Sequence, residues 1–335
     1  MNTFLQLPPE RQRTIFEETQ ARRGLTAQSL EKDFWVCWTL RELFTLPGWV
    51  GHLTFKGGTS LSKAWGLIDR LSEDIDVVID REYLGFGGEK LSNKKIGKLR
   101  AESARRVQED IQPAFAARIA TLLPAESQKK VTLTVDPEAK DGQTLLFVYP
   151  TVFDVPADYL QPRVKIEMGA RSHIEPHADA TIRPYIAEEF PAVAPDASFP
   201  IRTVLARRTF WEKVMALHEL RLQPEDKRDP EKSLARHYYD VHRLIAAGIA
   251  DEAVADVALF DQVREHRINF FPFNWMDYET LRRGKINPVP LDQHLAGWKK
   301  DYTAMRREMF FDDPPDFDVV LNSVAEFAAK FNAGS

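Results

Sequence analysis

The sequence predicts an α+β protein in which a domain with a mixed sheet, residues 1–202, is followed by a helical domain, residues 203–335. Two observations support this prediction. Short β-branched segments of alternating polarity, separated by turns, occur in the first part of the chain. From residue 205 onward, apolar residues recur instead with the helical period of 3.6 residues.

The predicted elements follow one another in a clear order along the chain. Pro47-Gly48 ends the second of two N-terminal helices, and glycines after the first strand turn the chain into another helix. The predicted segments are helices at 10–23, 27–46, 60–67 and 94–123, strands at 52–56, 72–80, 131–135, 144–149 and 163–168, a proline-rich strand and linker at 172–200, and helical stretches at 205–247, 251–266, 291–309 and 315–332.

The composition is that of a soluble globular protein, with 335 residues of which 44% are hydrophobic and 28% charged. A net charge of −5 gives no general attraction to nucleic acid, although a local basic stripe would matter more than the sum. Cys37 is the single cysteine, which excludes an intramolecular disulfide and fits a reducing compartment. Since the chain has no signal-peptide pattern and no apolar run of membrane-spanning length, we expect a cytoplasmic enzyme without membrane contact.

A glycine turn with hydroxyl residues, Lys56-Gly57-Gly58-Thr59-Ser60, lies between a predicted strand and the following helix. Backbone N–H groups in such a turn can face a polyphosphate, and the glycines allow a close approach of the backbone to a ligand. We therefore interpret these five residues as a nucleotide-binding segment for the β- and γ-phosphates of a triphosphate. The alternative is an ordinary glycine turn with a Ser/Thr helix cap, and the motif taken alone favours that alternative.

Two carboxylates, Asp74 and Asp76, alternate with Ile75 and Val77 in a predicted strand. In extended backbone, residues two apart project from the same face, so these side chains could hold divalent cations a few ångströms apart. A two-metal site usually needs a third carboxylate from a neighbouring strand, and Glu167 is the best candidate. We predict that Asp74, Asp76 and Glu167 bind two Mg²⁺ ions. The assignment of Glu167 depends on a strand order that the sequence does not give.

Two predicted helices in the C-terminal part carry further candidate site residues. Lys213 lies on an amphipathic helix and could reach a phosphate as a point charge. Asp240 follows Arg236 and His237 by about one turn on another helix. Surface lysines and Arg–Asp pairs at this spacing usually contribute nothing to catalysis. The residue types alone therefore leave both roles open.

Taken together, these motifs resemble the AbiEii/AbiGii toxin family of nucleotidyltransferases, part of the DNA polymerase β-like superfamily. The resemblance spans residues 28–245 and rests most on the glycine turn and the first acidic strand. The segments that carry it are Glu31-Lys32-Asp33, Phe55 to Lys63, Arg70 to Asp76, Lys165-Ile166-Glu167, Glu212-Lys213 with Ala216-Leu217, and Arg236 to Asp240.

The resemblance implies a polymerase β-like nucleotidyltransferase domain and a Mg²⁺-dependent enzyme that transfers a nucleoside monophosphate from an NTP substrate to a hydroxyl group. The site residues that it implies are Gly58 and Ser60 for phosphate, Asp74 and Asp76 for metal, Lys213 for the triphosphate, and Asp240 to complete the site from the helical domain. With Glu167 from the strand argument, the predicted catalytic residues are Asp74, Asp76, Glu167, Lys213 and Asp240.

The family consists of toxins from bacterial toxin–antitoxin or phage-abortive systems, so the resemblance also implies a cognate antitoxin protein as partner. Some relatives place nucleotides on the acceptor end of tRNA, which makes RNA the expected acceptor. The alternatives are a protein or small-molecule acceptor, or a module that binds NTP without turnover. A charged insertion at 223–232 departs from the family pattern. Because of this insertion, Asp240 could lie at a different distance from the site, or Asp229 could replace Asp240.

Basic clusters are available for an RNA acceptor, and aromatic residues precede the last of them. Such a mixture can stack bases beside phosphate contacts, although aromatic runs of this density more often pack a core. The residues are Lys94, Lys95, Lys98, Lys129, Lys130, Arg207, Arg208, Phe270, Phe271, Phe273, Trp275, Arg282, Arg283 and Lys285. The sequence does not identify the base, the acceptor or the antitoxin.

Overall fold

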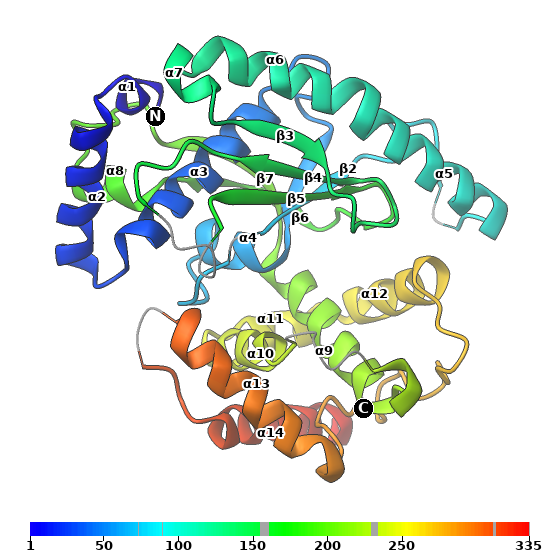
Figure 1. Ribbon diagram of the computed structural model, residues 1–335. Helices are drawn as coiled ribbons and strands as arrows, with labels where there is room; N and C mark the ends of the chain where they lie inside the picture. The colour runs from blue at the N-terminus through cyan, green and yellow to red at the C-terminus, as the bar shows by residue number, and fades with distance from the viewer. Residues whose placement is uncertain (73, 89, 155–160, 229–233, 311–312, 335) are drawn as a thin grey trace. The chain divides into compact units, whose positions relative to one another are not determined.

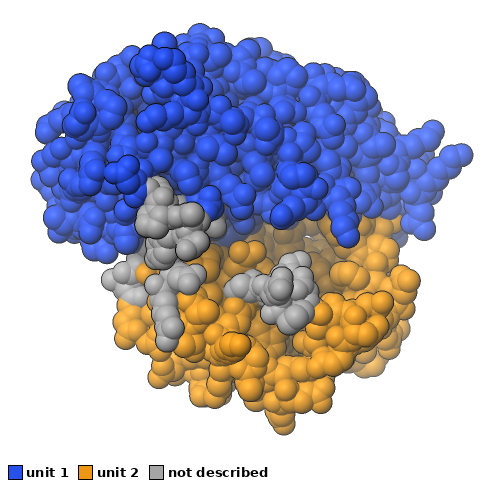
Figure 2. Space-filling model, in the orientation of Figure 1, with its two compact units in different colours: residues 1–64, 71–203 blue, residues 65–70, 204–335 orange. Residues whose placement is uncertain are grey.

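The computed structural model of the chain describes residues 1–72, 74–88, 90–154, 161–228, 234–310 and 313–334. The chain divides into two compact units, shown in different colours in Figure 2. Unit 1 comprises residues 1–64 and 71–203, and unit 2 comprises residues 65–70 and 204–335. The second unit therefore includes a short segment that lies between the glycine turn and the acidic strand in the sequence.

Unit 1 is built around a mixed sheet, whose strand order in the described part of the chain is β3-β4-β5-β2-β1-β7-β6 (Figure 1). Strand β2 runs parallel to β5 and β1 runs parallel to β7, while the pairs β1–β2, β3–β4 and β4–β5 are antiparallel. The strands are β1 (Leu53–Lys56), β2 (Asp74–Ile79), β3 (Thr132–Val135), β4 (Thr144–Val148), β5 (Arg163–Gly169), β6 (His177–Ile182) and β7 (Phe199–Val204). The predicted fold class, a mixed-sheet α+β domain followed by helices, is confirmed.

The helices of unit 1 pack on the sheet and on one another (Figure 1). They are α1 (Asn2–Leu5), α2 (Pro9–Arg23), α3 (Ala27–Phe44), α4 (Gly57–Lys63), α5 (Asn93–Arg106), α6 (Gln112–Leu122), α7 (Ala125–Gln128) and α8 (Tyr185–Glu189). The single helix predicted over 94–123 is instead α5 and α6 joined by a wider π turn, η1 (Val107–Ile111). Pro113 explains the interruption, because proline lacks the backbone N–H that would continue the helix and its ring crowds the carbonyl four residues earlier.

One face of the sheet is apolar, because alternate residues of each strand point to the same side. Phe147 of β4 contacts Trp35 and Trp38 of α3 and Phe115 of α6, with ring centroids 5.8 to 5.9 Å apart. All four side chains are almost fully buried. The core of unit 1 therefore lies between this face and the helices α3 and α6, and the opposite face is left for the polar side chains of β2 and β5.

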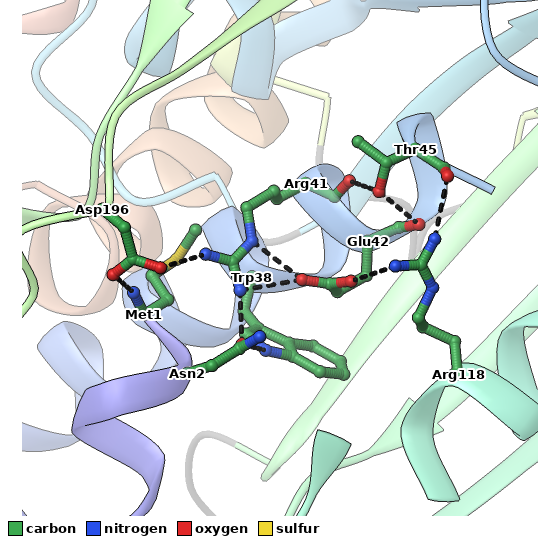
Figure 3. A network of polar contacts seen from close by, with 8 residues as sticks. All are labelled: Met1, Asn2, Trp38, Arg41, Glu42, Thr45, Arg118 and Asp196. Carbon is green, nitrogen blue, oxygen red and sulfur yellow. Dashed lines mark hydrogen bonds and ion pairs between the residues drawn. The ribbon is translucent and has the colours of Figure 1, made fainter. Parts of the chain in front are cut away.

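A polar network joins α3, α6 and the first residue of the chain (Figure 3). Arg41 binds Glu42 at 2.8 Å and Asp196 at 3.4 Å, and the Met1 ammonium donates to Asp196 at 2.7 Å. Arg118 of α6 lies 3.3 Å from the second carboxylate oxygen of Glu42. Two guanidinium groups thus compensate the charge of Glu42, whose side chain is only 4% exposed.

Unit 2 is helical and has an aromatic core of its own. Its helices are α9 (Ala206–Leu222), η2 (Glu225–Lys227), α10 (Arg236–Ala246), α11 (Ile249–Ala255), α12 (Val257–Phe270), η3 (Asp292–His294), α13 (Leu295–Glu308) and α14 (Phe317–Ala333). Trp211 of α9 packs edge-to-face on Phe260 of α12, with ring centroids 5.0 Å apart. Trp65 ties the segment 65–70 to this unit by donating its indole N–H to the Val204 carbonyl at 3.0 Å. Among the described residues of the whole chain, no helix is long and apolar enough to cross a membrane.

Candidate active site

The two neighbouring strands β2 and β5 bring the predicted acidic residues onto one face of the sheet. Asp76 pairs in register with Glu167, and Asp74 pairs with Lys165. Residues in register on neighbouring strands point to the same face, and all four side chains are partly exposed. Ile75, between the two aspartates, is fully buried on the apolar face. The strand order that the sequence left open therefore places Glu167 on the strand next to the aspartates.

The glycine turn lies directly against the acidic strand. Lys56, the last residue of β1, pairs in register with Asp76. Gly57 follows with a φ of +81°, a region that side chains other than glycine rarely adopt. A Cβ atom at Gly57 would lie 1.9 Å from Asp76 Oδ2. The Asp76 carboxylate thus packs on the bare backbone of Gly57, and only glycine fits there.

Hydroxyl groups of α4 fix the shape of the turn. The Thr59 hydroxyl lies 2.8 Å from the Ser72 hydroxyl and also donates to the Asp74 carbonyl. Ser60 donates its hydroxyl to the Gly57 carbonyl at 2.8 Å. Both side chains are almost fully buried. Thr59 holds the turn to the strand that carries the aspartates, and Ser60 forms a bond within the turn. The contact of either residue with a nucleotide stays a prediction.

A cation already lies among the carboxylates of this face. Lys165 Nζ is 2.6 Å from Glu167 Oε1. Burial lowers the pKa of Lys165, but the hydrogen bond and charge of Glu167, with the charges of Asp74 and Asp136, outweigh this, so that the pKa stands above its ordinary value. Lys165 is therefore an ammonium ion that compensates part of the negative charge.

The side chains on the acidic face are of the type that binds a divalent cation, but they are not grouped as a metal site. Carboxylate oxygens are the ligands that Mg²⁺ prefers, and Asp74 and Asp76 share one face of one strand. However, among the described residues no three side chains of Asp, Glu, His or Cys are grouped closely enough to hold a metal ion. Glu167 is bound to Lys165 and would have to leave it to join the aspartates.

A second group of predicted site residues is assembled within unit 2. Asp240 of α10 is completely buried, and Arg70 donates to both of its oxygens from Nε and Nη2, each at 2.7 Å. Lys213 Nζ of α9 lies 2.9 Å from Asp240 Oδ2. Burial alone would raise the pKa of Asp240, but Arg70 and Lys213 together hold it below its ordinary value. Asp240 is therefore a charged carboxylate shared by two cations.

His237 completes this buried cluster. Its Nδ1 lies 3.3 Å from Lys213 Nζ. Burial, and then the charge of Lys213, push the pKa of His237 well below its ordinary value, so the neutral ring can accept a hydrogen bond from the ammonium group. Burial also lowers the pKa of Lys213, although Asp240 opposes this effect. Lys213 therefore contacts both His237 and the Asp240 carboxylate inside this cluster.

Neither Arg70 nor His237 was predicted as a site residue. For His237 a signal was present, because residues three apart on a helix lie on the same face and His237 precedes Asp240 by three positions. Arg70 is 170 positions from Asp240, and no local spacing reveals such a pair. Asp229, considered as a substitute for Asp240, lies outside the described residues.

The residues proposed for RNA contact are divided between core and surface. Arg208 is fully buried and pairs with Glu212 at 3.1 Å, so it is not available as part of a basic surface. Phe270 is also buried. Phe273, in contrast, is 42% exposed and stacks on Trp275 with ring centroids 4.8 Å apart. Of the four aromatic residues in this run, Phe273 is the exposed one, while Phe271 and Trp275 are half-buried.

A mixed sheet with an acidic strand packed against a glycine turn is the arrangement expected of a nucleotide-transferring enzyme. The family model described as nucleotidyl transferase AbiEii toxin, type IV TA system, matches residues 38–323. The chain belongs to this family of nucleotidyltransferase toxins, as its motifs predicted. The match continues well beyond residue 245, into a part of the chain that carries no motif of the family resemblance described above.

Two solved structures are similar to this chain at low sequence identity. JHP933 from Helicobacter pylori is 12% identical with a TM-score of 0.43, over 92% of this chain and 94% of that one. The nucleotidyltransferase toxin MenT4 from Mycobacterium tuberculosis H37Rv is 14% identical with a TM-score of 0.44, over 95% of this chain and 98% of that one. Similarity at this level assigns no residue and no substrate. A search of curated proteins gave no match.

Proposed function

We propose that this protein is a toxin that transfers a nucleoside monophosphate from an NTP to a hydroxyl group of RNA, with the acceptor end of tRNA as the first candidate. The contact between Gly57 and the Asp76 carboxylate carries the proposal. Through it, the turn that would admit a triphosphate adjoins the strand that would hold metal. Nucleotidyl transfer requires these two functions side by side, because catalysis consists mostly of positioning the phosphates and neutralising their charge.

Asp74, Asp76 and Glu167 are the residues that would hold two Mg²⁺ ions. When bound, the ions would activate the acceptor hydroxyl and stabilise the leaving pyrophosphate. The neighbouring Lys165 would release Glu167 and keep its positive charge at the same face.

The remaining site residues would bind and orient the triphosphate. Gly57 and Gly58 would let it approach the backbone, and Lys213 would attract its negative charge. Asp240 is buried between Arg70 and Lys213, so we assign it the role of holding the ammonium group in place, without contact to substrate.

A cognate antitoxin would restrain this activity, as the type IV toxin–antitoxin description of the family supports. The transfer assay tests whether the antitoxin acts on the enzyme directly, because such an antitoxin must lower the rate of transfer in a mixture of the two purified proteins.

The Asp76→Asn variant tests the proposed chemistry. We expect nucleotide transfer to fall by about 100-fold or more, since even residues that only support metal ligands typically matter by ~10- to 100-fold. The assay incubates purified protein with total RNA, Mg²⁺ and each α-labelled NTP in turn. Asp179→Asn, a change at an exposed aspartate of β6, is the matched control and should leave transfer unchanged. Transfer by Asp76→Asn at the wild-type rate would remove Asp76 from the site.

The labelled product identifies the acceptor. Label that is lost on RNase digestion supports an RNA acceptor, whereas label that is lost only on protease digestion would mean that the acceptor is a protein. Binding of an NTP without release of pyrophosphate, in the presence of total RNA and Mg²⁺, would contradict an enzymatic function.

A further inference from the structure

Asp33 of α3 and Lys63, the last residue of α4, form an ion pair inside unit 1. Lys63 Nζ lies 2.6 Å from Asp33 Oδ1, and the two side chains are only 6% and 7% exposed. The same ammonium group lies 3.6 Å from the centre of the Tyr185 ring. The backbone N–H of Tyr185 donates to the other Asp33 oxygen at 2.8 Å. The helices α3, α4 and α8 thus meet at one buried pair of charges.

This pair is buried, which makes its geometry demanding. Burial raises the pKa of the nearby Cys37 thiol far above its ordinary value. Burial also lowers the pKa of Lys63, but the charge of Asp33 outweighs it, so that this pKa stands above its ordinary value. If either Asp33 or Lys63 moved away from the other, a buried charge would be left without compensation, and this costs free energy.

The two residues before Asp33 attach α3 to a different part of unit 1. Glu31 accepts hydrogen bonds from the Thr151 hydroxyl at 2.6 Å and from the Val152 N–H at 2.8 Å. Lys32 donates to the Gln161 carbonyl at 3.3 Å. With these attachments α3 is a fixed frame, and Asp33 is the point at which it holds α4.

The other end of α4 contacts the acidic strand. Gly57, its first residue, lies against Asp76, and Thr59 donates to the Asp74 carbonyl. The helix has seven residues, so Lys63 and Gly57 lie within two helical turns of one another. A shift at Lys63 would therefore move Gly57 relative to the carboxylate.

We infer that Asp33 and Lys63 are positioning residues for nucleotidyl transfer, whose ion pair sets the place of the glycine turn against the strand of Asp74 and Asp76. This inference rests on the proposed function. A buried ion pair adds little net stability, because the loss of hydration offsets the attraction, and an apolar pair often packs as well. What the pair adds is a defined geometry, and a misplacement of about 1 Å can lower a rate by ~100-fold.

The double variant Asp33→Asn/Lys63→Met removes both buried charges, and the new amide oxygen can still accept from the Tyr185 N–H. We expect it to melt cooperatively near the wild-type temperature, to raise KM for the NTP by about 10-fold or more and to lower kcat. Hydrogen exchange in residues 57–63 should become faster. Lys63→Arg keeps the charge and should retain KM within about 3-fold, since a guanidinium can pair with the same carboxylate.

A control is Glu42→Gln/Arg118→Met, which removes a comparably buried carboxylate and one of its two guanidinium partners, between α3 and α6 (Figure 3). It should leave KM, kcat and the exchange of residues 57–63 at wild-type values. Equal kinetics and exchange in the two double variants would overturn the inference. Should the Asp33 and Lys63 variant not fold, Tyr185→Leu decides instead, because it removes the ring that Lys63 shares with Arg23 while both charges of the ion pair stay. An unchanged KM would then overturn the inference.

Failure of the proposed function can be told apart from failure of this inference. If the wild-type protein transfers no nucleotide to any acceptor, the proposed function is wrong. In that case the variants can still be compared by their affinities for each of the four NTPs, measured by calorimetry in the presence of Ca²⁺. We expect about 10-fold weaker binding in the Asp33 and Lys63 double variant than in the control, and equal affinities would contradict the positioning role.

Discussion

Gly57 has a φ of +81°, and a Cβ atom at this position would lie 1.9 Å from Asp76 Oδ2. A side chain would therefore strain the backbone and push the carboxylate away from the turn. The two most specific sequence motifs of the chain, the glycine turn and the acidic strand, are joined at this one contact. At the scale of single residues, the absence of a side chain at Gly57 is therefore what allows the Asp76 carboxylate to lie where it does.

We expect Gly57→Ala to lower nucleotide transfer by about 10-fold or more, because the new methyl group displaces Asp76. Gly51→Ala is the control, since Gly51 has a φ of +80° but no atom within 4 Å of a Cβ. Both variants should lose about 1–2 kcal/mol of unfolding free energy from the left-handed backbone, and Gly57→Ala should lose more. Urea unfolding and the transfer assay measure the two effects, and equal losses in both variants would mean that the Asp76 contact has no influence.

At the scale of secondary-structure elements, α3 depends on a buried carboxyl group. The pKa of Glu31 is raised from 4.5 to about 7, because burial outweighs the hydrogen bonds from Thr151 and Val152. Between these two values the folded protein keeps a proton that the unfolded chain has lost. The free energy of unfolding therefore falls as the pH rises from about 4.5 to about 7, and it stays lower above that range.

Glu31→Gln should remove this pH dependence, because an amide keeps a hydrogen-bonding oxygen but carries no proton that titrates. We expect the variant to gain stability relative to the wild type as the pH rises, by on the order of 3 kcal/mol above pH 7. Below about pH 4.5 the carboxyl group is protonated in both the folded and the unfolded state. The unfolding free energies of the wild type and the variant should therefore change in parallel there. Urea unfolding at several pH values between about 4 and 8 tests this, and a constant difference across that range would contradict the assignment.

Local periodicity predicted most elements, because regular spacing of apolar residues is what packing uses. The helix predicted at 27–46 is α3, and the strand predicted at 163–168 is β5. The region 172–200 was predicted only as a strand and linker. Its prolines hid the helix α8 and the start of β7. A short helix and strands that pair with distant partners leave little local pattern.

The candidate site could be predicted only as far as its contacts are local in sequence. The i and i+2 spacing was enough to place Asp74 and Asp76 on one face of a strand. The position of Glu167 beside Asp76 depends on the order of the strands in the sheet. The pairing of Lys63 with Asp33 depends on how the helices pack. Both depend on residues far apart in the sequence, so no short motif contains them.

At the scale of the whole molecule, the chain passes between the two units three times, after residues 64, 70 and 203. The segment 65–70 supplies unit 2 with several of its contacts. Ile68 is 2% exposed, Asp69 lies 2.7 Å from Arg243, and Arg70 binds both oxygens of Asp240. A cut near residue 203 would therefore leave the helical unit without Arg70, one of the two cations that compensate the buried charge of Asp240.

We expect the fragment 204–335 to be less stable than the same fragment with residues 65–70 joined to its N-terminus by a short Gly/Ser linker. Removal of one partner from a buried ion pair costs about 3–5 kcal/mol, which is a large part of the roughly 5–15 kcal/mol that keeps a domain folded. Urea unfolding followed by circular dichroism compares the two fragments. Arg70→Met in the joined fragment should abolish most of the gain, because Asp240 would again face Lys213 alone. Equal urea midpoints with and without the segment would show that unit 2 does not depend on it.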